Sequence, residues 1–319
     1  MTDILTITLN PSLDLSAETG AVIAGPKLRL SEPVAEPGGG GINAARAAAA
    51  LGGQARAVAA LGGLTGGRIQ QLLDRTGVIL SVFSLPGETR QSLSVTDQSS
   101  GEQYRFVMPG PLWTAAQVVE LLARLADDVR RMGAGAVVVL SGSQPPGIRA
   151  SFPTDLVRVL PGARVIVDTS GAALDLLVRQ PEAGATPHVL RMDHVESESL
   201  AGQPLRGVAD SLDFAQDLVV RGVAEVVILA RGAEGSVLAT RDLRLHCAPP
   251  RVAVQSKIGA GDSFTGVFAL ALAQGQGLPE ALRRGTAAAA AAVMTPGSEL
   301  CRGEDALRLV AACHVFDAV

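Results

Sequence analysis

EPGGGGINAARAAAA, residues 36–50, places four consecutive glycines directly before an alanine-rich, helix-forming segment. Glycines at such a point let a ligand approach the backbone, and the start of a helix presents unpaired N–H groups. A plain strand-to-helix turn needs fewer glycines, so we interpret Gly38–Gly41 as a loop that faces a ligand. The stretch lacks the GxxxxGK[ST] pattern of a Walker A loop, and it follows a polar, proline-containing segment rather than the core strand of a dinucleotide fingerprint.

A second glycine-rich turn, Gly259-Ala260-Gly261-Asp262, opens the apolar helix expected at Ser263–Ala273. Consecutive N–H groups at a helix start form a site for an anion such as a phosphoryl group. Asp262 would lie beside this anion and could accept a proton from an attacking hydroxyl. Aspartate is also a favoured N-cap residue, so the residues alone leave a purely capping role open.

Short apolar runs alternate with longer amphipathic segments along the chain, which is typical of a parallel sheet covered by helices on both faces. The 319 residues are therefore expected to form an α/β fold with a single domain over residues 1–319. The expected buried strands are Ile4–Leu9, Ala136–Leu140, Arg164–Val167, His188–Leu190 and Glu225–Leu229. The expected helices are Ile42–Leu51, Gly66–Asp74, Thr114–Met132, Ala172–Val178, Ala209–Val220, Ser263–Ala273 and Leu278–Met294.

Two stretches instead alternate polar and apolar residues, as strands with one exposed face do. The strands expected there are Lys27–Ala35, Ser81–Leu85, Gln91–Thr96 and Gln103–Val107. Two or three strands cannot form a stable sheet alone. We therefore expect a small β lid, formed by about residues 12–36 and 81–108, that packs on the main domain.

Further candidates for ligand contact lie on a loop and on the lid. Ser141–Gly147 follows a core strand, where ligand loops of open α/β sheets lie, although its two prolines could simply shape the loop. Arg90 and Arg105 lie on expected lid strands. They are either solvated or in surface ion pairs, or they clamp a substrate phosphate, for which a guanidinium fork is well shaped.

The composition argues against several classes of protein. A net charge of −4 without a basic stripe argues against a nucleic-acid binder. The N-terminus lacks the features of a signal peptide, and the small-apolar run Ala287–Met294 is far shorter than the roughly 20 residues of a membrane span. Three cysteines without metal-type spacing suit reduced thiols, so we expect a soluble cytoplasmic protein with no membrane partner.

Taken together, these motifs resemble the ribokinase-type (PfkB) carbohydrate kinases, over essentially the whole chain. The pairing of GGGGxN with GAGD at this spacing is the most specific feature, and Tyr104–Gly110 (YRFVMPG) is similar to the 6-phosphofructokinase branch. The resemblance rests on Asn10–Asp14, Pro37–Asn43, Ser100–Gly110, Ser141–Gly147 and Gly259–Asp262.

The resemblance implies a ribokinase-like three-layer α/β sandwich with a mainly parallel central sheet, and a β lid that also forms a homodimer interface. It implies ATP and Mg²⁺ as cofactors and transfer of the γ-phosphoryl group to the C1 hydroxyl of fructose 6-phosphate, giving fructose 1,6-bisphosphate. Asp262 would be the general base, and the backbone of Gly259, Ala260 and Gly261 would stabilise the developing charge.

The remaining expected site residues divide into two groups. The substrate-binding candidates are Asp14, Lys27, Arg29, Gly39, Gly40, Asn43, Arg90, Arg105 and Ser141. The resemblance places Arg29 at a lid position that reaches a neighbouring subunit. The ATP-binding candidates are Arg191, Asp193, Ala230, Gly232, Gly235, Lys257 and Ala290, with Glu196 acting indirectly on Mg²⁺.

The chain departs from the family pattern on the nucleotide side. The departures are Arg191 for lysine, Asp193 for asparagine, Lys257 for threonine, and Thr295 and Glu299 where members that bind a monovalent cation have asparagine and arginine. Use of K⁺ therefore stays open. Lys257, one of only two lysines in a chain with 25 arginines, could supply the positive charge instead, with Glu299 and Asp193 as its partners.

Three alternatives to fructose 6-phosphate phosphorylation stay open. Tagatose 6-phosphate and fructose 1-phosphate differ from it in ways that motif residues do not resolve. The departures on the nucleotide side also allow a sugar-phosphate-binding regulator with weakened ATP chemistry, although the intact Gly259–Asp262 turn argues against it.

Overall fold

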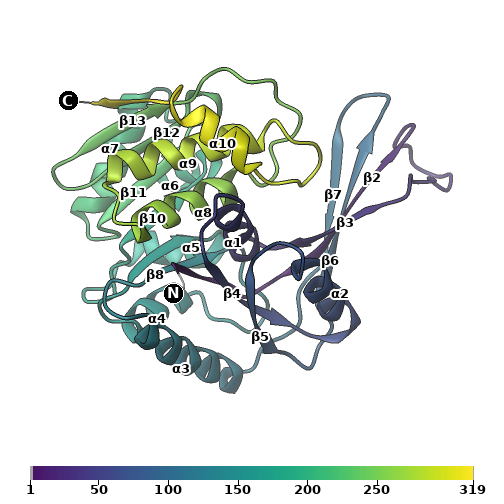
Figure 1. The fold of residues 1–319 in the computed structure, drawn as a ribbon, viewed down its shortest axis with the longest axis horizontal. Coiled ribbons are helices and arrows are strands. Elements are labelled where there is room, and N and C mark those ends of the chain that lie inside the picture. Colours follow the sequence, from purple (N-terminus) through teal and green to yellow (C-terminus); the bar gives the residue numbers. More distant parts are fainter. Residues whose placement is uncertain (1–2, 319) are drawn as a thin grey trace.

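A large twisted sheet runs through the protein and is covered by helices on both faces (Figure 1). The structure is a computed structural model that describes residues 3–318. The sheet order is β14 (His314–Asp317), β13 (Arg244–Ala248), β12 (Ser236–Ala239), β11 (Val226–Ala230), β10 (Val189–Met192), β9 (Arg164–Asp168), β8 (Val137–Ser141), β1 (Ile4–Thr8), β4 (Ala55–Leu61) and β5 (Ile79–Ser84).

The strands from β5 across to β11 are all parallel, and β12, β13 and β14 extend one edge in antiparallel pairs. Strands β1 and β8 are short apolar runs that are buried throughout. This is the composition that a parallel strand needs, because helices cover both of its faces. The mainly parallel α/β fold predicted from the sequence is confirmed.

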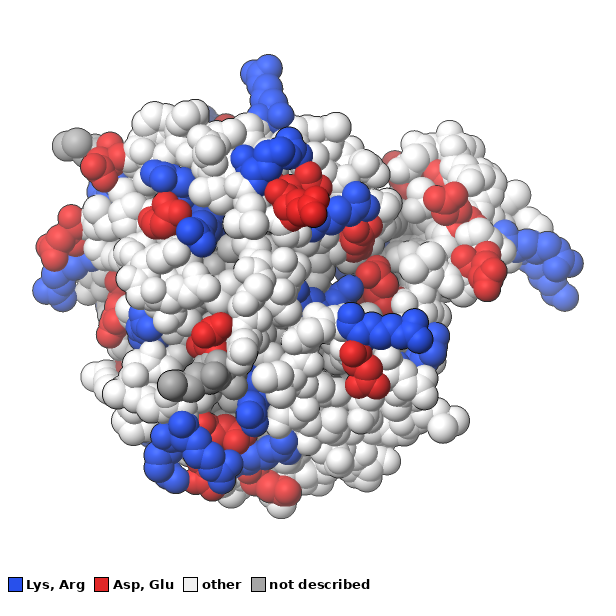
Figure 2. All heavy atoms as spheres, viewed as in Figure 1, with Lys and Arg blue, Asp and Glu red and all other residues white. Residues whose placement is uncertain are grey.

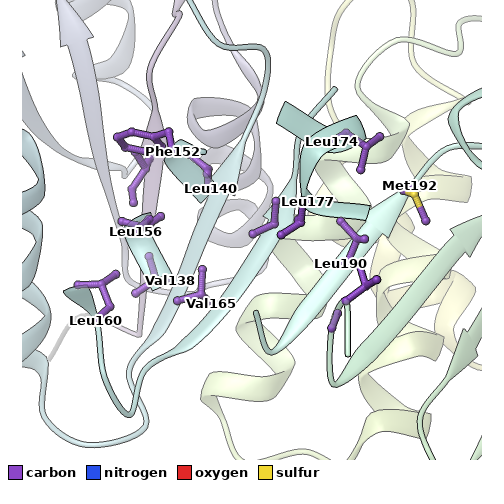
Figure 3. Packing of buried hydrophobic residues seen from close by; sticks show 14 of the residues in the cluster. Val138, Leu140, Phe152, Leu156, Leu160, Val165, Leu174, Leu177, Leu190 and Met192 are labelled. Atoms are coloured by element: carbon purple, nitrogen blue, oxygen red, sulfur yellow. The ribbon is translucent and has the colours of Figure 1, made fainter. Parts of the chain in front are cut away.

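The helices form two layers that enclose separate parts of the core. One face is covered by α3 (Ala115–Met132), α4 (Phe152–Val159), α5 (Gly171–Arg179), α6 (His194–Ala201) and α7 (Val208–Val220), and the other by α1 (Gly40–Ala50), α8 (Ala260–Ala273), α9 (Leu278–Ala292) and α10 (Gly303–Val310). In the first layer, Phe152 and Leu156 of α4 pack near Val138 and Leu140 of β8 (Figure 3).

In the second layer, α1 and α8 approach each other unusually closely. A Cβ atom on Gly266 of α8 would lie 2.1 Å from the carbonyl oxygen of Ala44 in α1. The alanines of α1 and this glycine therefore bring the two helix backbones together. Their N-termini carry the two glycine-rich turns, so this contact also brings those turns together.

The lid is a separate four-stranded sheet with the order β3 (Val34–Gly38), β2 (Ser12–Thr19), β6 (Arg90–Asp97) and β7 (Gln103–Val107). It projects from one side of the body, and α2 (Gly63–Leu73) packs at its base (Figure 1). The residues alternate strictly: Asp14, Glu36 and Arg105 share one face, whereas Leu15 and Phe106 lie on the other.

Two predicted lid strands are wrong. Residues 81–84 of the predicted strand Ser81–Leu85 fall in β5, which pairs with β4 at the edge of the central sheet. Its alternating pattern arose because an edge strand of the body also has one exposed face. Residues 27–33 form no strand; only the last two residues of the predicted segment Lys27–Ala35 fall in β3, and the lid strand that was missed is β2.

The surface carries both signs of charge. On the face shown in Figure 2, acidic and basic side chains intermingle over the body, and a notch separates the body from the lid. Across residues 3–318, no helix is both long enough and apolar enough to span a membrane.

Candidate active site

The two glycine-rich turns meet at a hydrogen bond between Asn43 and Asp262. Asn43 lies in the first turn of α1, and its Nδ2 donates to Asp262 Oδ2 in the first turn of α8 at 2.8 Å. Residues 219 positions apart in the sequence are thus joined because the starts of two adjacent helices converge. The capping alternative does not hold, since the N-cap of α8 is Gly259 and the Asp262 carboxylate faces Asn43.

The surroundings of Asp262 favour its protonated form. Burial raises the pKa of this carboxyl to about 6, the hydrogen bond from Asn43 opposes the rise, and the charge of Asp168 adds to it. The Arg191 guanidinium lowers the pKa, and Asp14 raises it slightly. A carboxylate whose pKa lies near 6 is well suited to accept a proton at neutral pH and release it afterwards.

The glycines before α1 are required by close contacts within the protein. A Cβ atom on Gly38 would lie 2.0 Å from Asp14 Oδ2, and one on Gly40 would lie 2.3 Å from Ser141 Oγ. Gly39, with φ of +114°, has a backbone conformation that other residues rarely adopt. The run therefore brings Asp14 of the lid and the buried Ser141 at the end of β8 against the start of α1, which the ligand-loop interpretation did not anticipate.

A buried ion pair that the sequence analysis missed lies behind the second turn. Arg191 of β10 donates to Asp168 Oδ1 at 3.2 Å, and Thr265 of α8 donates to Asp168 Oδ2 at 2.8 Å. The Arg191 guanidinium lies so close to Gly261 that a Cβ atom there would be 2.9 Å from it. The only signal for Asp168 in the sequence is its place as the polar residue that ends a buried strand.

On the lid, the polar face presents an acid and two arginines. Asp14 accepts a hydrogen bond from Ser12 Oγ at 2.6 Å. Burial raises the pKa of Asp14, whereas Ser12, Arg90 and Arg105 lower it. Arg90 donates to the carbonyl of Asn10 at 3.2 Å, and its pKa is lowered by burial and by Arg105. Two guanidinium groups held near each other in this way form a site for an anion.

Lys27 and Arg29 lie elsewhere in the same chain. Thr19 at the far end of β2 donates to the carbonyl of Arg29 at 3.2 Å, whereas Arg90 pairs with Ser12 at the near end. Seven strand residues, or about 23 Å at ~3.3 Å each, separate these two ends. Within one chain the structure therefore does not bring Lys27 and Arg29 to Arg90.

The expected ATP-binding segment follows β11. Ala230 ends that strand, and Gly232 lies in a short turn where a side chain would meet open space. Gly235 is instead fixed by packing, because a Cβ atom there would lie 1.9 Å from the carbonyl oxygen of Cys247. Ala290 is only 7% exposed in α9 and offers little surface to a nucleotide.

Asp193 and Glu196 form the reciprocal cap of helix α6. The Glu196 N–H donates to Asp193 Oδ1 at 2.8 Å, and the Asp193 N–H donates to Glu196 Oε2 at 2.9 Å. Burial raises the pKa of Glu196 to about 7, the hydrogen bond from Asp193 opposes it, and the Asp193 and Asp168 charges add to it. The aspartate that replaces asparagine thus keeps the capping function.

The structure contradicts the ion pairs expected for Lys257. Glu299 accepts from Arg302 at 2.7 and 3.1 Å, and Asp193 is engaged at α6. Among residues 3–318, no carboxylate lies within 4.0 Å of the Lys257 ammonium. Lys257 instead lines a cleft of about 1120 Å³ between the lid and the body, together with Ser16, Glu36, Arg105 and Ser298.

The loop after β8 contacts the segment that enters the lid before β2 and the segment that leaves it after β7. The Asn10 side chain donates to Ser143 Oγ at 3.1 Å, and the backbone N–H of Trp113 donates to the carbonyl of Pro146 at 2.9 Å. Trp113, the single tryptophan of the chain, is buried and stacks on Phe83 with ring centroids 5.3 Å apart.

Comparison with known families agrees with this geometry. The model of the pfkB family carbohydrate kinase matches residues 6–304. The chain belongs to this family. This confirms the resemblance found from the GGGGxN and GAGD motifs.

Among pfkB relatives, the chain is 38% identical to the "ATP-dependent 6-phosphofructokinase isozyme 2" of Escherichia coli K12 over 98% of this chain and 99% of that protein. It is 32% identical to a "1-phosphofructokinase" of Xanthomonas campestris over 84% and 83%.

The E. coli phosphofructokinase-2 structure in complex with fructose-6-phosphate superposes with a TM-score of 0.87 at 37% identity, covering 98% of this chain and 99% of that one. Other structures of that enzyme are described as a complex with potassium and as a tetrameric inhibited form. The fold class is thereby confirmed as ribokinase-like.

Proposed function

We propose that this chain is an ATP-dependent 6-phosphofructokinase that converts fructose 6-phosphate to fructose 1,6-bisphosphate. The observation that carries the proposal is the position of Asp262, which is held by Asn43 at the glycine-rich start of α8 with a pKa of about 6. The full-length similarity to enzymes of this activity supports the choice of substrate.

In this proposal, Asp262 accepts the proton of the C1 hydroxyl as that oxygen attacks the γ-phosphorus of ATP. The bond between the γ-phosphorus and the β,γ-bridging oxygen breaks, and ADP leaves. The N–H groups of Gly259–Asp262 stabilise the negative charge that develops on the transferring group. Arg191, which lies against Gly261 and is fixed by Asp168, adds a positive charge there. Arg90 and Arg105 on the lid bind the 6-phosphate, and Asp14 orients the sugar through its hydroxyls.

Glu196 fits a role beside Mg²⁺ that arrives with ATP. Residues 3–318 contain no cluster of three metal-ligating side chains, but Mg²⁺ commonly uses one or two carboxylates together with substrate phosphates. The half-buried Glu196 has acidic neighbours, and a cation would relieve their repulsion. Glu196 would help to hold the ion, and Mg²⁺ bound there would supply positive charge to the phosphate oxygens of ATP.

An ADP-release assay with a panel of sugar phosphates tests this function. The wild-type protein is incubated with Mg-ATP and fructose 6-phosphate, tagatose 6-phosphate or fructose 1-phosphate, and kcat/KM is compared. We expect the highest value for fructose 6-phosphate. A higher value for either of the others would replace the proposed substrate, and binding of a sugar phosphate without ADP release would indicate a regulator instead.

The outer face of the lid supports a homodimer. Phe106 is 54% exposed and lies on the face opposite Asp14 together with Leu15 and Leu93. Apolar side chains gathered on one exposed sheet face are typical of an interaction surface. In this proposed dimer, Lys27 and Arg29, which lie far from Arg90 within one chain, act at the sugar site of the partner subunit.

The cysteines fit the cytoplasmic location in which the proposal places the enzyme. Cys247, Cys301 and Cys313 are all buried and form no disulfide. A reducing compartment keeps such thiols in this state.

A further inference from the structure

A continuous chain of polar side chains runs from the lid to Asp262 through Arg46 of α1. Arg46 Nη2 pairs with Glu36 Oε1 of β3 at 3.3 Å, and Arg46 Nη1 donates to the carbonyl of Pro37 at 3.1 Å and to Asn43 Oδ1 at 3.4 Å. Asn43 then donates to Asp262. The side chains of Arg46 and Glu36 are only 16% and 19% exposed, so solvent screens this pair far less than a surface ion pair.

The chemistry of these groups fixes the orientation of the Asn43 carboxamide. Its oxygen accepts hydrogen bonds and its NH₂ group donates them, whereas a guanidinium only donates and an ionised carboxylate only accepts. With Arg46 on one side and Asp262 on the other, the oxygen must face Arg46 and the NH₂ group must face Asp262. The Asp262 carboxylate already selects the NH₂ group, and Arg46 holds the same orientation from the other side by donating to the carboxamide oxygen.

Arg46 is itself held by the lid. Glu36 of β3 lies opposite Asp14 of β2 in the register of the two strands. Its second carboxylate oxygen accepts a hydrogen bond from Ser298 in the loop after α9. Glu36 therefore joins the lid, helix α1 and the C-terminal part of the body at one carboxylate. Arg46 lies one helical turn after Asn43, which is the spacing at which two side chains of a helix meet.

We propose that Arg46 is a positioning residue for phosphoryl transfer: anchored by Glu36 and the Pro37 carbonyl, it aims the Asn43 NH₂ group at the Asp262 carboxylate. The inference rests on the proposed function, because Asp262 must be the base for the orientation to matter. Arg46 touches neither reactant in this scheme and acts only through Asn43.

Three other charged groups act on the pKa of Asp262, and a substitution of Arg46 leaves all three in place. Asp168 from β9 and Asp14 from β2 raise its pKa, and Arg191 from β10 lowers it. None of these three makes a hydrogen bond to Asn43 or Arg46 among the described contacts. Loss of Arg46 therefore weakens the hydrogen bond from Asn43 that favours ionised Asp262 and leaves the acidic neighbours in place.

The test is the pH dependence of kcat for Arg46→Gln. We expect the acid limb to move upward by about one pH unit, because a lost hydrogen bond to a charged group changes proton affinity about tenfold. Turnover should fall about fivefold at pH 6, where the wild-type carboxyl is half ionised, approach a tenfold loss at lower pH, and recover toward the wild-type value near pH 8.5. The matched control is Arg124→Gln. Arg124 of α3 also donates to a strand backbone, at the carbonyl of Val82, but it lies outside the site.

A double-variant cycle with Asn43→Ala shows whether Arg46 acts through Asn43. We expect Arg46→Gln to add no further loss of kcat when Asn43 is already alanine. Should Arg46→Gln fail to fold, Glu36→Gln takes its place, with a shift of the acid limb in the same direction supporting the proposal.

Three outcomes overturn it: an unchanged acid limb in a folded variant, a loss of kcat that is equal at every pH, or additive effects of Arg46→Gln and Asn43→Ala. The wild-type profile separates this inference from the function on which it rests. If the wild-type protein does not phosphorylate any sugar phosphate, the proposed function fails and the role of Arg46 fails with it. If the wild-type is active and only the variants disagree, the function stands and the inference alone is rejected.

Discussion

At the scale of single residues, the same burial that raises the pKa of Asp262, the proposed general base, also opposes folding. Its pKa of about 6 lies above the ordinary value of 3.8, so the folded protein binds this proton more tightly than the unfolded chain. The native state therefore carries an unfavourable ionisation that is absent below pH 4, grows between pH 4 and 6, and is complete at higher pH. Residues at functional sites commonly combine activity with such a cost in stability.

Because the buried carboxylate of Asp262 is proposed to serve catalysis and also destabilises the fold, Asp262→Asn should change both turnover and thermal stability. Turnover should fall roughly 10²- to 10⁴-fold, because no general base remains. The Tm should rise at pH 8, where the buried charge is removed, and the difference from wild type should vanish near pH 4. Steady-state kinetics and thermal unfolding over this pH range measure both.

The control is Asp127→Asn, because Asp127 is a half-exposed surface residue of α3 paired with Arg130. It should change neither the kinetics nor the pH dependence of the Tm. Near-normal turnover of Asp262→Asn would contradict the assignment of the base.

Single residues also show which parts of the candidate site could be predicted from the sequence. Asn43 and Asp262 could be predicted as candidates because Asn43 follows one glycine-rich turn and Asp262 ends the other, and such local patterns are visible in the sequence. Asp168 and Arg46 could not, since their roles depend on which strands and helices lie side by side. The partners of Lys257 were predicted wrongly because Arg302 lies one turn after Glu299 and competes for it.

At the scale of elements, the close approach of α1 and α8 sets the geometry of the site. The contact depends on Gly266, where a side chain would enter the backbone of α1. The strands of the parallel sheet could be predicted because they are continuous apolar runs. The lid strands were partly misassigned because β5, at the edge of the body, has the same alternating pattern as the lid.

We predict that Gly266→Ala separates the two helices and weakens the hydrogen bond between Asn43 and Asp262. Overpacking of this kind costs about 1–3 kcal/mol of stability. The expected result is a lower Tm together with a loss of kcat that exceeds the loss in substrate affinity, measured by thermal unfolding and initial rates.

Gly67→Ala on α2 is the control, because a side chain there meets open space. A Gly266→Ala variant with an unchanged Tm would show that the helices accommodate the methyl group.

At the scale of the whole molecule, the lid is a thin sheet with two unlike faces. The face with Glu36 and Arg105 lines the cleft, and the face with Phe106 is partly uncovered. A four-stranded sheet with one apolar face is stabilised when another surface covers that face. This separation of faces could be read from the alternation in the sequence, but the occupant of the outer face could not.

We predict that Phe106→Glu disrupts the proposed homodimer and leaves a monomer with reduced kcat/KM for fructose 6-phosphate. A charge in the centre of an apolar interface opposes association, whereas an exposed site on a monomer tolerates it within about 0.5 kcal/mol. Sedimentation velocity measures the mass of the particle, and thermal unfolding of the monomer provides the control. An unchanged oligomer would place the interface elsewhere.

The stacked pair of Trp113 and Phe83 gives the protein an internal optical reporter. Trp113 is the single tryptophan, it lies where the chain returns from the lid, and its backbone contacts the loop that begins at Ser141. All indole emission therefore comes from the junction between lid and body. Stopped-flow fluorescence of the unlabelled protein should follow movement of the lid in real time, without an introduced dye or a second tryptophan to separate.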